Sequence, residues 1–263
     1  MILKYGDRSQ VVRNLQRDLN TQGSKLFLDG VYGDATEAAV RAYQLKVGLV
    51  SDGVAGPKTL ASLQGADTGK LLKHADLVQA SGRLGVPVAT LYALNEVESK
   101  GRGFLDNGKP VILFERHVMH QRLRQRAVAL ARVYPALVNP KPGGYIGGTA
   151  EHQRLSQARQ LDDIAALESA SWGAFQVMGY HWQRLGYACI HSFVEAMQRS
   201  EADHLEALMR FIEADARLHK ALKELQWSMV AKRYNGPDYR RNLYDVKLER
   251  AFERHQGRTQ VAA

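Results

Sequence analysis

The chain has 263 residues, of which 45% are hydrophobic and 24% charged, and its 36 Lys and Arg against 27 Asp and Glu give a net charge of +9. This length and composition exclude a disordered chain, a fibrous repeat and a small disulfide-stapled peptide, and the charge predicts an anionic partner. With one cysteine, no export signal and no run of 18 apolar residues, we expect synthesis in a reducing cytoplasm and no transmembrane segment.

The first 64 residues contain an internal repeat of the pattern DGxxGxxT, which begins at Asp29 and again at Asp52. The glycines suit tight turns that need positive φ. Asp34 in the first copy is predicted as an N-cap, and Pro57 in the second copy as the first residue of a helix. With an earlier helix that starts close to Ser9, the pattern predicts a unit of three short helices.

Further pairs in this segment are Tyr5-Gly6, Leu15-Gln16, Tyr32-Gly33, Tyr43-Gln44, Gly48-Leu49 and Thr59-Leu60. With the repeat, they resemble the three-helix peptidoglycan-binding domain of cell-wall hydrolases over nearly all of residues 1–64, which implies wall binding without catalysis. The binding residues that the resemblance implies are Asp29, Gly30, Tyr32, Gly33 and Thr36. Turn chemistry alone also explains most of the glycines. Residues 65–70 are predicted as a linker, because they contain two glycines and no apolar anchor.

From Leu71 onward the apolar residues follow a helical period, so the larger domain, residues 71–263, is expected to be mostly α. The predicted helices span residues 71–82, 87–99, 117–134, 151–168, 193–200, 202–215, 218–233 and 239–254. Ser192 and Glu195 are predicted to form a capping box. Asn107-Gly108, followed by the apolar residues 111–114, predicts one small β-hairpin with a type I′ turn.

One acidic residue lies on the apolar side of the helix predicted over 87–99. At 100° per residue Glu98 falls on the same stripe as Leu91 and Leu94, whereas Glu96 faces away. A carboxyl group in apolar surroundings keeps part of its population protonated near neutral pH, which a general acid in glycoside cleavage requires. Periodicity leaves a second interpretation equally open, in which Glu98 reaches solvent where the helix ends.

Four motifs follow in order along the larger domain. They are VESKGRGF from Val97, LFERH from Leu113, ESASWGAFQVMG from Glu168 and RYNG from Arg233. Together they resemble the phage-type N-acetylmuramidase family of the lysozyme superfamily over roughly residues 75–255. The resemblance implies a modular phage endolysin whose lysozyme-like, α-rich domain cuts the β-1,4 bond between N-acetylmuramic acid and N-acetylglucosamine.

The resemblance identifies Glu98 as the catalytic acid. The residues that it implies for the sugar groove are Ser171, Trp172, Gly173, Phe175, Gln176, Met178, Tyr234 and Asn235. Trp172 and Phe175 at this spacing also suit a hydrophobic core.

An inverting hydrolysis also needs a base for the attacking water. We prefer Glu115 over Asp106 for this role, although Arg116 and His117 beside Glu115 fit a structural ion pair almost as well. Transglycosylases of the superfamily use no second carboxyl group and form a 1,6-anhydro product. A lytic transglycosylase therefore stays open as an alternative.

Two other classes of function compete with this interpretation. A zinc amidase or peptidase is disfavoured because His117 and His120 are the only close histidine pair and no HExxH motif is present. A non-enzymatic wall-binding or nucleic-acid-binding protein fits the charge, but the basic residues are scattered and no nucleic-acid-binding motif is found.

We therefore expect a monomer that binds peptidoglycan and uses no nucleic acid partner, metal or organic cofactor. Its positive charge predicts electrostatic contact with anionic outer-membrane lipids. The resemblance to phage endolysins implies that the protein stays in the host cytoplasm until a holin releases it to the cell wall.

Overall fold

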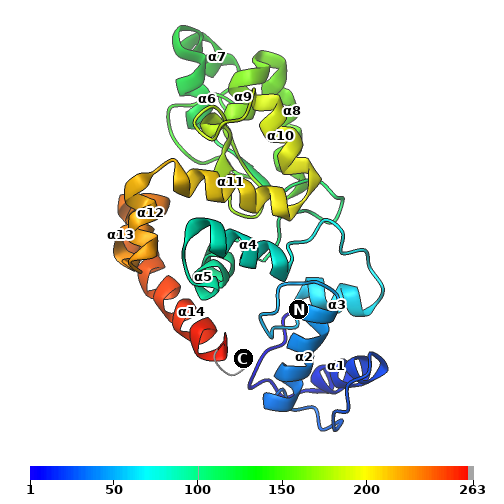
Figure 1. Cartoon of the computed structure of the whole chain (residues 1–263). Helices are drawn as coiled ribbons and strands as arrows, with labels where there is room; N and C mark the ends of the chain where they lie inside the picture. The colour runs from blue at the N-terminus through cyan, green and yellow to red at the C-terminus, as the bar shows by residue number, and fades with distance from the viewer. Residues whose placement is uncertain (100, 260–263) are drawn as a thin grey trace. The chain divides into compact units, whose positions relative to one another are not determined.

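The computed structural model describes residues 1–99 and 101–259, and it consists of helices with one small sheet (Figure 1). Lys100, within the first motif of the larger domain, and residues 260–263, at the end of that domain, lie outside the described residues. The chain divides into two compact units, one formed by Met1–Tyr92 with Phe252–Ala263 and the other by Ala93–Ala251. The boundaries expected at residues 64 and 71 stay a prediction.

None of the helices in the described part of the chain has the length and apolar character needed to cross a membrane.

The first unit begins with the three short helices that the repeat predicts. Its helices are α1 (Gln10–Thr21), α2 (Asp34–Lys46), α3 (Pro57–Leu63), α4 (His74–Leu84), the start of α5 (Val88–Glu98) and the end of α14 (Tyr244–Thr259). Ser9 caps α1 by accepting a hydrogen bond from the Val12 amide, and Pro57 is the first residue of α3. The N-cap of α2 is Gly33, so the prediction of Asp34 as the cap is wrong by one residue.

The hydrophobic core of the three-helix part is formed by residues that precede the predicted linker. Its buried members are Leu3, Val12, Leu15, Leu19, Tyr32, Val40, Tyr43 and Ala55. A core made from these residues supports the expectation that residues 1–64 fold as a module.

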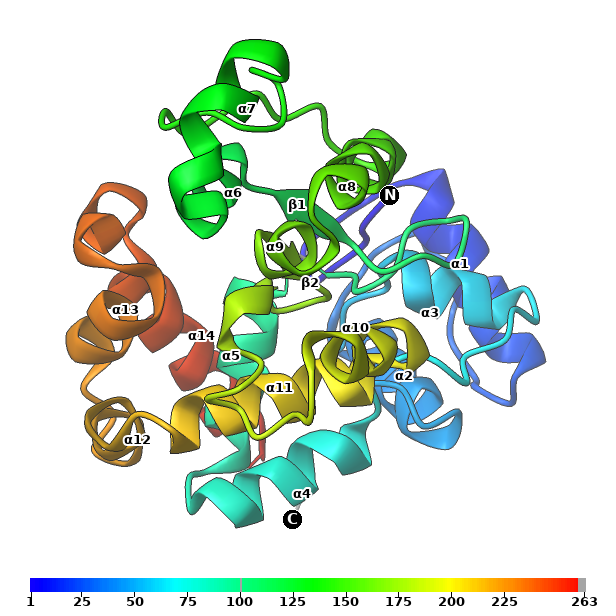
Figure 2. The same ribbon diagram turned by 90° about the horizontal axis from the view of Figure 1, so that it is seen from above.

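The second unit is mostly helical. Its helices are α6 (Arg116–Leu123), α7 (Ala127–Val133), α8 (Thr149–Leu161), α9 (Asp163–Glu168), α10 (Ile190–Arg199), α11 (Glu201–Glu213), α12 (Ala216–Lys223) and α13 (Trp227–Asn235). Three short 3-10 helices accompany them: η1 (Arg124–Arg126), η2 (Gly179–His181) and η3 (Pro237–Asn242). Its strands are β1 (Ile112–Phe114), β2 (Ala170–Trp172) and β3 (Val177–Met178). Helices α6, α8 and α9 lie around the strands (Figure 2).

Three helices that the periodicity predicts as continuous are interrupted. Arg124 and Leu225 adopt positive φ angles of 51° and 54°, which end α6 and separate α12 from α13. Asp162 is extended and its side chain accepts the Ala165 amide, so it starts α9 as an N-cap. The capping box of α10 is formed by Cys189 with Ser192, and therefore lies three residues before the predicted position. Apolar periodicity does not detect such breaks, because the buried stripe resumes after each of them.

The sheet is antiparallel with the order β1-β2-β3. Ile112 pairs with Trp172, and Ser171 pairs with Met178. The hairpin expected around Asn107 is only a single bridge between Phe104 and Pro110. Its turn is not of type I′, because Gly108 has a positive φ and Asn107 does not. The apolar run is a strand as predicted, but its partner β2 comes from a distant part of the chain. The expected fold class, mostly α with a small β element, is confirmed.

Candidate active site

Helix α5 carries Glu98 as its last residue. Leu91 and Leu94 are buried, Glu96 is exposed and Glu98 is half-buried. This pattern confirms the helix phase read from the sequence. Glu98 therefore lies at a helix end with its side chain partly enclosed, while Glu96 offers a solvent-facing carboxylate two residues away.

Three segments meet at Glu98. Asn235, the last residue of α13, donates a hydrogen bond from Nδ2 to Glu98 Oε1 at 3.0 Å. The neighbouring Tyr234 donates its hydroxyl hydrogen to the carbonyl oxygen of Phe175 at 2.8 Å. These two hydrogen bonds join the ends of α5 and α13 to the turn between β2 and β3. Of the site residues predicted from the sequence, they bring together Glu98, Phe175, Tyr234 and Asn235.

The charge of Glu98 affects the pKa of two phenol groups, those of Tyr234 and Tyr244. Burial is the main cause that raises the pKa of Tyr234 well above its ordinary value, and the charges of Glu98 and Tyr244 raise it further. Burial and then Glu98 also raise the pKa of Tyr244, the first residue of α14. Both hydroxyl groups therefore stay protonated and act as hydrogen-bond donors near neutral pH. Tyr244 was missed by the sequence analysis, because it lies outside the RYNG motif.

The turn between β2 and β3 is closed by its own side chains. Gly173 and Gln176 have positive φ angles of 73° and 51°. Gln176 donates from Nε2 to the Gly173 carbonyl at 2.8 Å and accepts the Ser171 hydroxyl at 2.8 Å on Oε1. Met178 lies on β3 opposite Ser171. The predicted groove residues of this motif thus form one rigid turn, and their contact with sugar stays a prediction.

The aromatic residues of the same motif lie in the core. Trp172 is 2% exposed and Phe175 is 3% exposed. The indole Nε1 of Trp172 donates to the Leu167 carbonyl at 3.2 Å. The structure therefore gives both side chains the packing role that their spacing also allowed, and any stacking on sugars remains a prediction.

Helix α11 fixes the two glycine segments that flank the site. Glu201 accepts the Gly103 amide on Oε1 at 2.7 Å, and His204 accepts the Ala174 amide on Nδ1 at 3.1 Å. Neither Gly103 nor Gly173 can carry a side chain, because an added Cβ atom would lie 2.5 or 2.6 Å from the His204 ring. Because Nδ1 accepts this bond, the ring carries its proton on Nε2, which donates to the Met197 carbonyl at 2.7 Å. Glu201 and His204 were also missed, since only the folded chain brings them beside the glycines.

Glu115 occupies the N-cap position of α6 and has two polar partners. The Tyr145 hydroxyl donates to its Oε2 at 2.8 Å, and His117 Nδ1 lies 3.2 Å from the same oxygen. Arg116, the other proposed ion-pair partner, donates instead to backbone carbonyls of the 140–148 segment. The alternative base, Asp106, is exposed and lies 3.6 Å from Arg102. The catalytic role of Glu115 stays a prediction.

Within residues 1–99 and 101–259, no group of three or more His, Cys, Asp or Glu side chains is arranged to hold a metal ion.

The two turns of the N-terminal module are built on buried glutamines. Gln16 Nε2 donates to Asp29, Thr36 and the Val31 carbonyl, and its Oε1 accepts the Gly30 amide. Gln44 repeats each of these four contacts in the second turn, where its partners are Asp52, Thr59, the Val54 carbonyl and the Gly53 amide. The sequence signal for these glutamines was weak, since Gln16 lies 13 residues before Asp29 and Gln44 lies 8 residues before Asp52.

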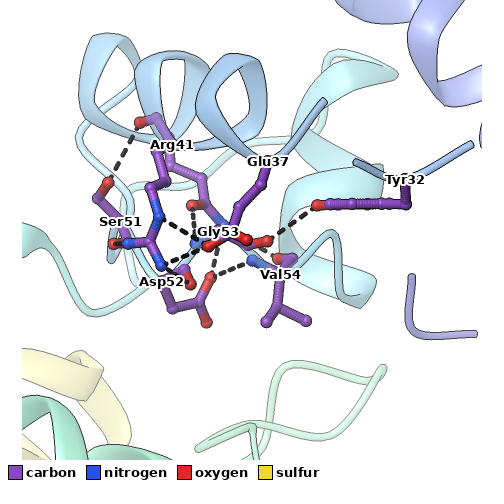
Figure 3. Close-up of polar contacts among 8 residues, drawn as sticks. Tyr32, Glu37, Arg41, Ser51, Asp52, Gly53 and Val54 are labelled. Carbon is purple, nitrogen blue, oxygen red and sulfur yellow. Dashed lines mark hydrogen bonds and ion pairs between the residues drawn. The ribbon is translucent and has the colours of Figure 1, made fainter. Parts of the chain in front are cut away.

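The predicted wall-binding residues all belong to this framework. Tyr32 is fully buried and its hydroxyl donates to the Gly53 carbonyl at 2.9 Å, so it links the two turns (Figure 3). Gly30 has a φ of 74° and an added Cβ would lie 2.9 Å from the Ser9 carbonyl oxygen. Gly33 caps α2, Thr36 is buried and Asp29 is exposed. Their structural roles are clear, and their contact with the wall stays a prediction.

The two parts of the chain place it in the class of modular peptidoglycan hydrolases. Residues 87–256 match the family described as N-acetylmuramidase, and residues 8–63 match the family described as "Putative peptidoglycan binding domain". The chain belongs to the N-acetylmuramidase family and is a glycoside hydrolase.

Two known proteins are similar to this chain. The crystal structure of a Burkholderia AP3 phage endolysin is 51% identical, superposes with a TM-score of 0.93, and the match covers 97% of this chain and 99% of that chain. A zinc D-Ala-D-Ala carboxypeptidase of Streptomyces albus G is 42% identical over 60 residues, which are 22% of this chain. The chain spans about a quarter of the length of this curated relative. The expected resemblance, the fold and peptidoglycan as the partner are confirmed.

Proposed function

We propose that the protein hydrolyses the β-1,4 bond between N-acetylmuramic acid and N-acetylglucosamine, with Glu98 as the general acid. The observation that carries this proposal is the hydrogen bond from Asn235 to Glu98, which holds the carboxyl group where α5, α13 and the β2–β3 turn meet. Glycoside cleavage needs a proton at the leaving oxygen. Of the two carboxyl groups of α5, Glu98 is half-buried and accepts a hydrogen bond from Asn235, whereas Glu96 is exposed.

The contact with Asn235 also suits the direction of proton transfer. The amide nitrogen is a donor only, so Oε1 of Glu98 acts as the acceptor and a proton on the carboxyl group belongs on Oε2. When Oε2 gives this proton to the leaving oxygen, the new carboxylate keeps the Asn235 hydrogen bond. Tyr234 and Tyr244 stay neutral beside it, so no second anion opposes the change.

For the base we propose Glu115. The hydroxyl of Tyr145 donates to its Oε2 at 2.8 Å and His117 Nδ1 lies 3.2 Å from the same oxygen, so both contacts hold the carboxyl group in place to receive a proton from water. An inverting mechanism requires a separation of about 6.5–9.5 Å between the two carboxyl groups. Glu115→Gln should then reduce turnover strongly without weakening wall binding.

The products of digestion in H₂¹⁸O test the reaction. Hydrolysis adds one ¹⁸O to the new reducing end, which mass spectrometry of the released fragments detects. A 1,6-anhydro product without ¹⁸O, together with an active Glu115→Gln variant, would overturn the hydrolytic proposal and identify a lytic transglycosylase. Incorporated ¹⁸O with an inactive Glu115→Gln variant supports both parts of the proposal.

The setting of the reaction is also part of the proposal. Residues 1–64 hold the enzyme on the wall, residues 65–70 act as the linker, and residues 71–263 cut the glycan. The likeness to a phage endolysin supports a role in host cell lysis. The protein would accumulate in the host cytoplasm and reach the wall when a holin opens the inner membrane. Induced expression in cells with and without a holin tests this, because lysis should need both.

A further inference from the structure

Helix α7 presents an apolar face to solvent. Ala127 is buried on its inner side, whereas Val128 is 61% exposed and Val133 is 67% exposed. Tyr134, directly after the helix, is 41% exposed. Arg132 is also exposed, and at 100° per residue its direction around the helix axis falls between those of Val128 and Val133. Within its own unit, α7 lies at the periphery in both views (Figures 1 and 2).

The sequence around α7 is basic and free of acidic residues. Between Glu115 and Glu151 there is no Asp or Glu, while the basic residues are Arg116, Arg122, Arg124, Arg126, Arg132 and Lys141. Arg122 and Arg126 pair with Glu168 and Asp162. In the described part of the chain, Arg124, Arg132 and Lys141 have no carboxylate at ion-pair distance. Cations without a carboxylate partner therefore lie just before α7, at Arg124, and within it, at Arg132.

The same acid-free stretch contains a further exposed apolar residue, Ile146, on a fixed backbone. Ile146 is 69% exposed, and its amide donates to the buried carboxylate of Glu151 at 2.7 Å. The Gly147 amide donates to the same oxygen at 3.0 Å. The two hydrogen bonds to Glu151 therefore fix the backbone of this segment while the Ile146 side chain lies in solvent.

We propose that this surface, formed by Arg124, Val128, Arg132, Val133 and Tyr134, docks on an anionic phospholipid bilayer. Lipid phosphates match the unpaired arginines, and the boundary between headgroups and acyl chains accepts the valines and the tyrosine. A hydrated glycan or a nucleic acid would satisfy the arginines but leave the apolar face in water. The charge and the apolar exposure together favour the bilayer over these polyanions.

Vesicle flotation with the full-length protein tests the proposal. Vesicles of phosphatidylcholine with phosphatidylglycerol should bind the protein at low salt, and pure phosphatidylcholine vesicles should bind it much more weakly. Arg124→Gln and Arg132→Gln should each weaken binding about fivefold. The double variant Val128→Ser/Val133→Ser should weaken it by a similar factor or more, because it removes apolar contact without changing charge. All of these positions lie outside the candidate active site, so activity on soluble wall fragments should not change.

The matched control is Ile164→Ser, which replaces a residue that is 54% exposed on α9 beside the acidic Asp163. This variant should bind vesicles like the unchanged protein. Equal binding to neutral vesicles, no binding to anionic ones, or full binding by the double valine variant would each overturn the proposal. Binding to purified peptidoglycan that falls in the same variants would assign the surface to the wall instead and would also overturn it.

Discussion

Replacement of Gln44 by alanine removes four hydrogen bonds from the second turn of the N-terminal module. The same change at Gln16 removes the four equivalent bonds from the first turn. Both glutamines are 2% exposed, so removing the side chain takes away the same buried packing in the two variants. The internal repeat thus supplies a matched pair of variants, Gln16→Ala and Gln44→Ala. Any difference in their stability reports the different surroundings of the two turns.

The two turns differ in the carboxyl group that each glutamine holds. Asp52 is half-buried, and burial raises its pKa, while Asp29 is exposed and the hydrogen bond from Gln16 lowers its pKa. When the glutamine is lost, water replaces it at Asp29 but reaches Asp52 less well. In each variant a buried glycine amide also loses its partner. A buried unsatisfied group costs about 1–3 kcal/mol, so we expect about 2 kcal/mol for Gln16→Ala and about 3 kcal/mol for Gln44→Ala.

Hydrogen exchange of the full-length protein measures this difference directly. Amides of residues 1–64, other than Gly30 and Gly53, should exchange roughly 30-fold faster in Gln16→Ala and roughly 150-fold faster in Gln44→Ala, since 1.4 kcal/mol corresponds to a factor of ten. Amides of the second unit serve as the internal reference. Equal effects in the two variants, or a larger effect of Gln16→Ala, would refute the argument from burial.

Three further predictions follow from the structure. Gly173→Ala should destabilise the second unit by about 3 kcal/mol or more, because the added Cβ would meet the His204 ring. Gly147 has a similar φ but lies in open space, so Gly147→Ala should cost only about 1–2 kcal/mol. Equal urea midpoints for the two variants would contradict this prediction. Burial lowers the pKa of His181 from 6.5 to about 4, so the folded chain binds fewer protons than the unfolded chain between these values. Stability should fall as the pH drops through this window, and urea unfolding of His181→Gln should show a flatter pH profile. Residues 1–64 alone should sediment with insoluble peptidoglycan, and the chain without them should bind wall less tightly than the whole protein, because the tether raises the local concentration.

Local patterns were sufficient for part of the site. The 3.6-residue period placed Glu98 and Glu96 on different sides of α5, and the structure shows this difference in exposure. The glycines of the repeat and the position of Pro57 at the start of α3 were also readable, because each depends on its immediate neighbours. The resemblance to known motifs added Tyr234 and Asn235, which the structure places beside the β2–β3 turn and Glu98.

Contacts between distant segments were beyond the same reasoning. Tyr244 lies near Glu98 only after the chain has turned through η3, and His204 approaches Gly103 and Gly173 from another helix. No periodicity or spacing connects such positions. The partner of β1 was missed for the same reason, since an apolar run does not show which distant strand will pair with it. The glutamines of the repeat belong to the same class of contact, because Gln16 and Gln44 precede Asp29 and Asp52 by different distances, 13 and 8 residues.

The most direct test of the central claim compares Glu98→Gln with Glu96→Gln. Glutamine at position 98 preserves the size of the side chain and the acceptor for Asn235, but it has no proton for the leaving oxygen. Turnover on purified peptidoglycan should fall about 10²- to 10⁴-fold, while wall binding and thermal stability stay unchanged. Glu96→Gln, on the exposed side of the same helix, should stay fully active. If Glu98→Gln kept more than about a tenth of the activity, or if Glu96→Gln were the inactive variant, Glu98 would not be the acid.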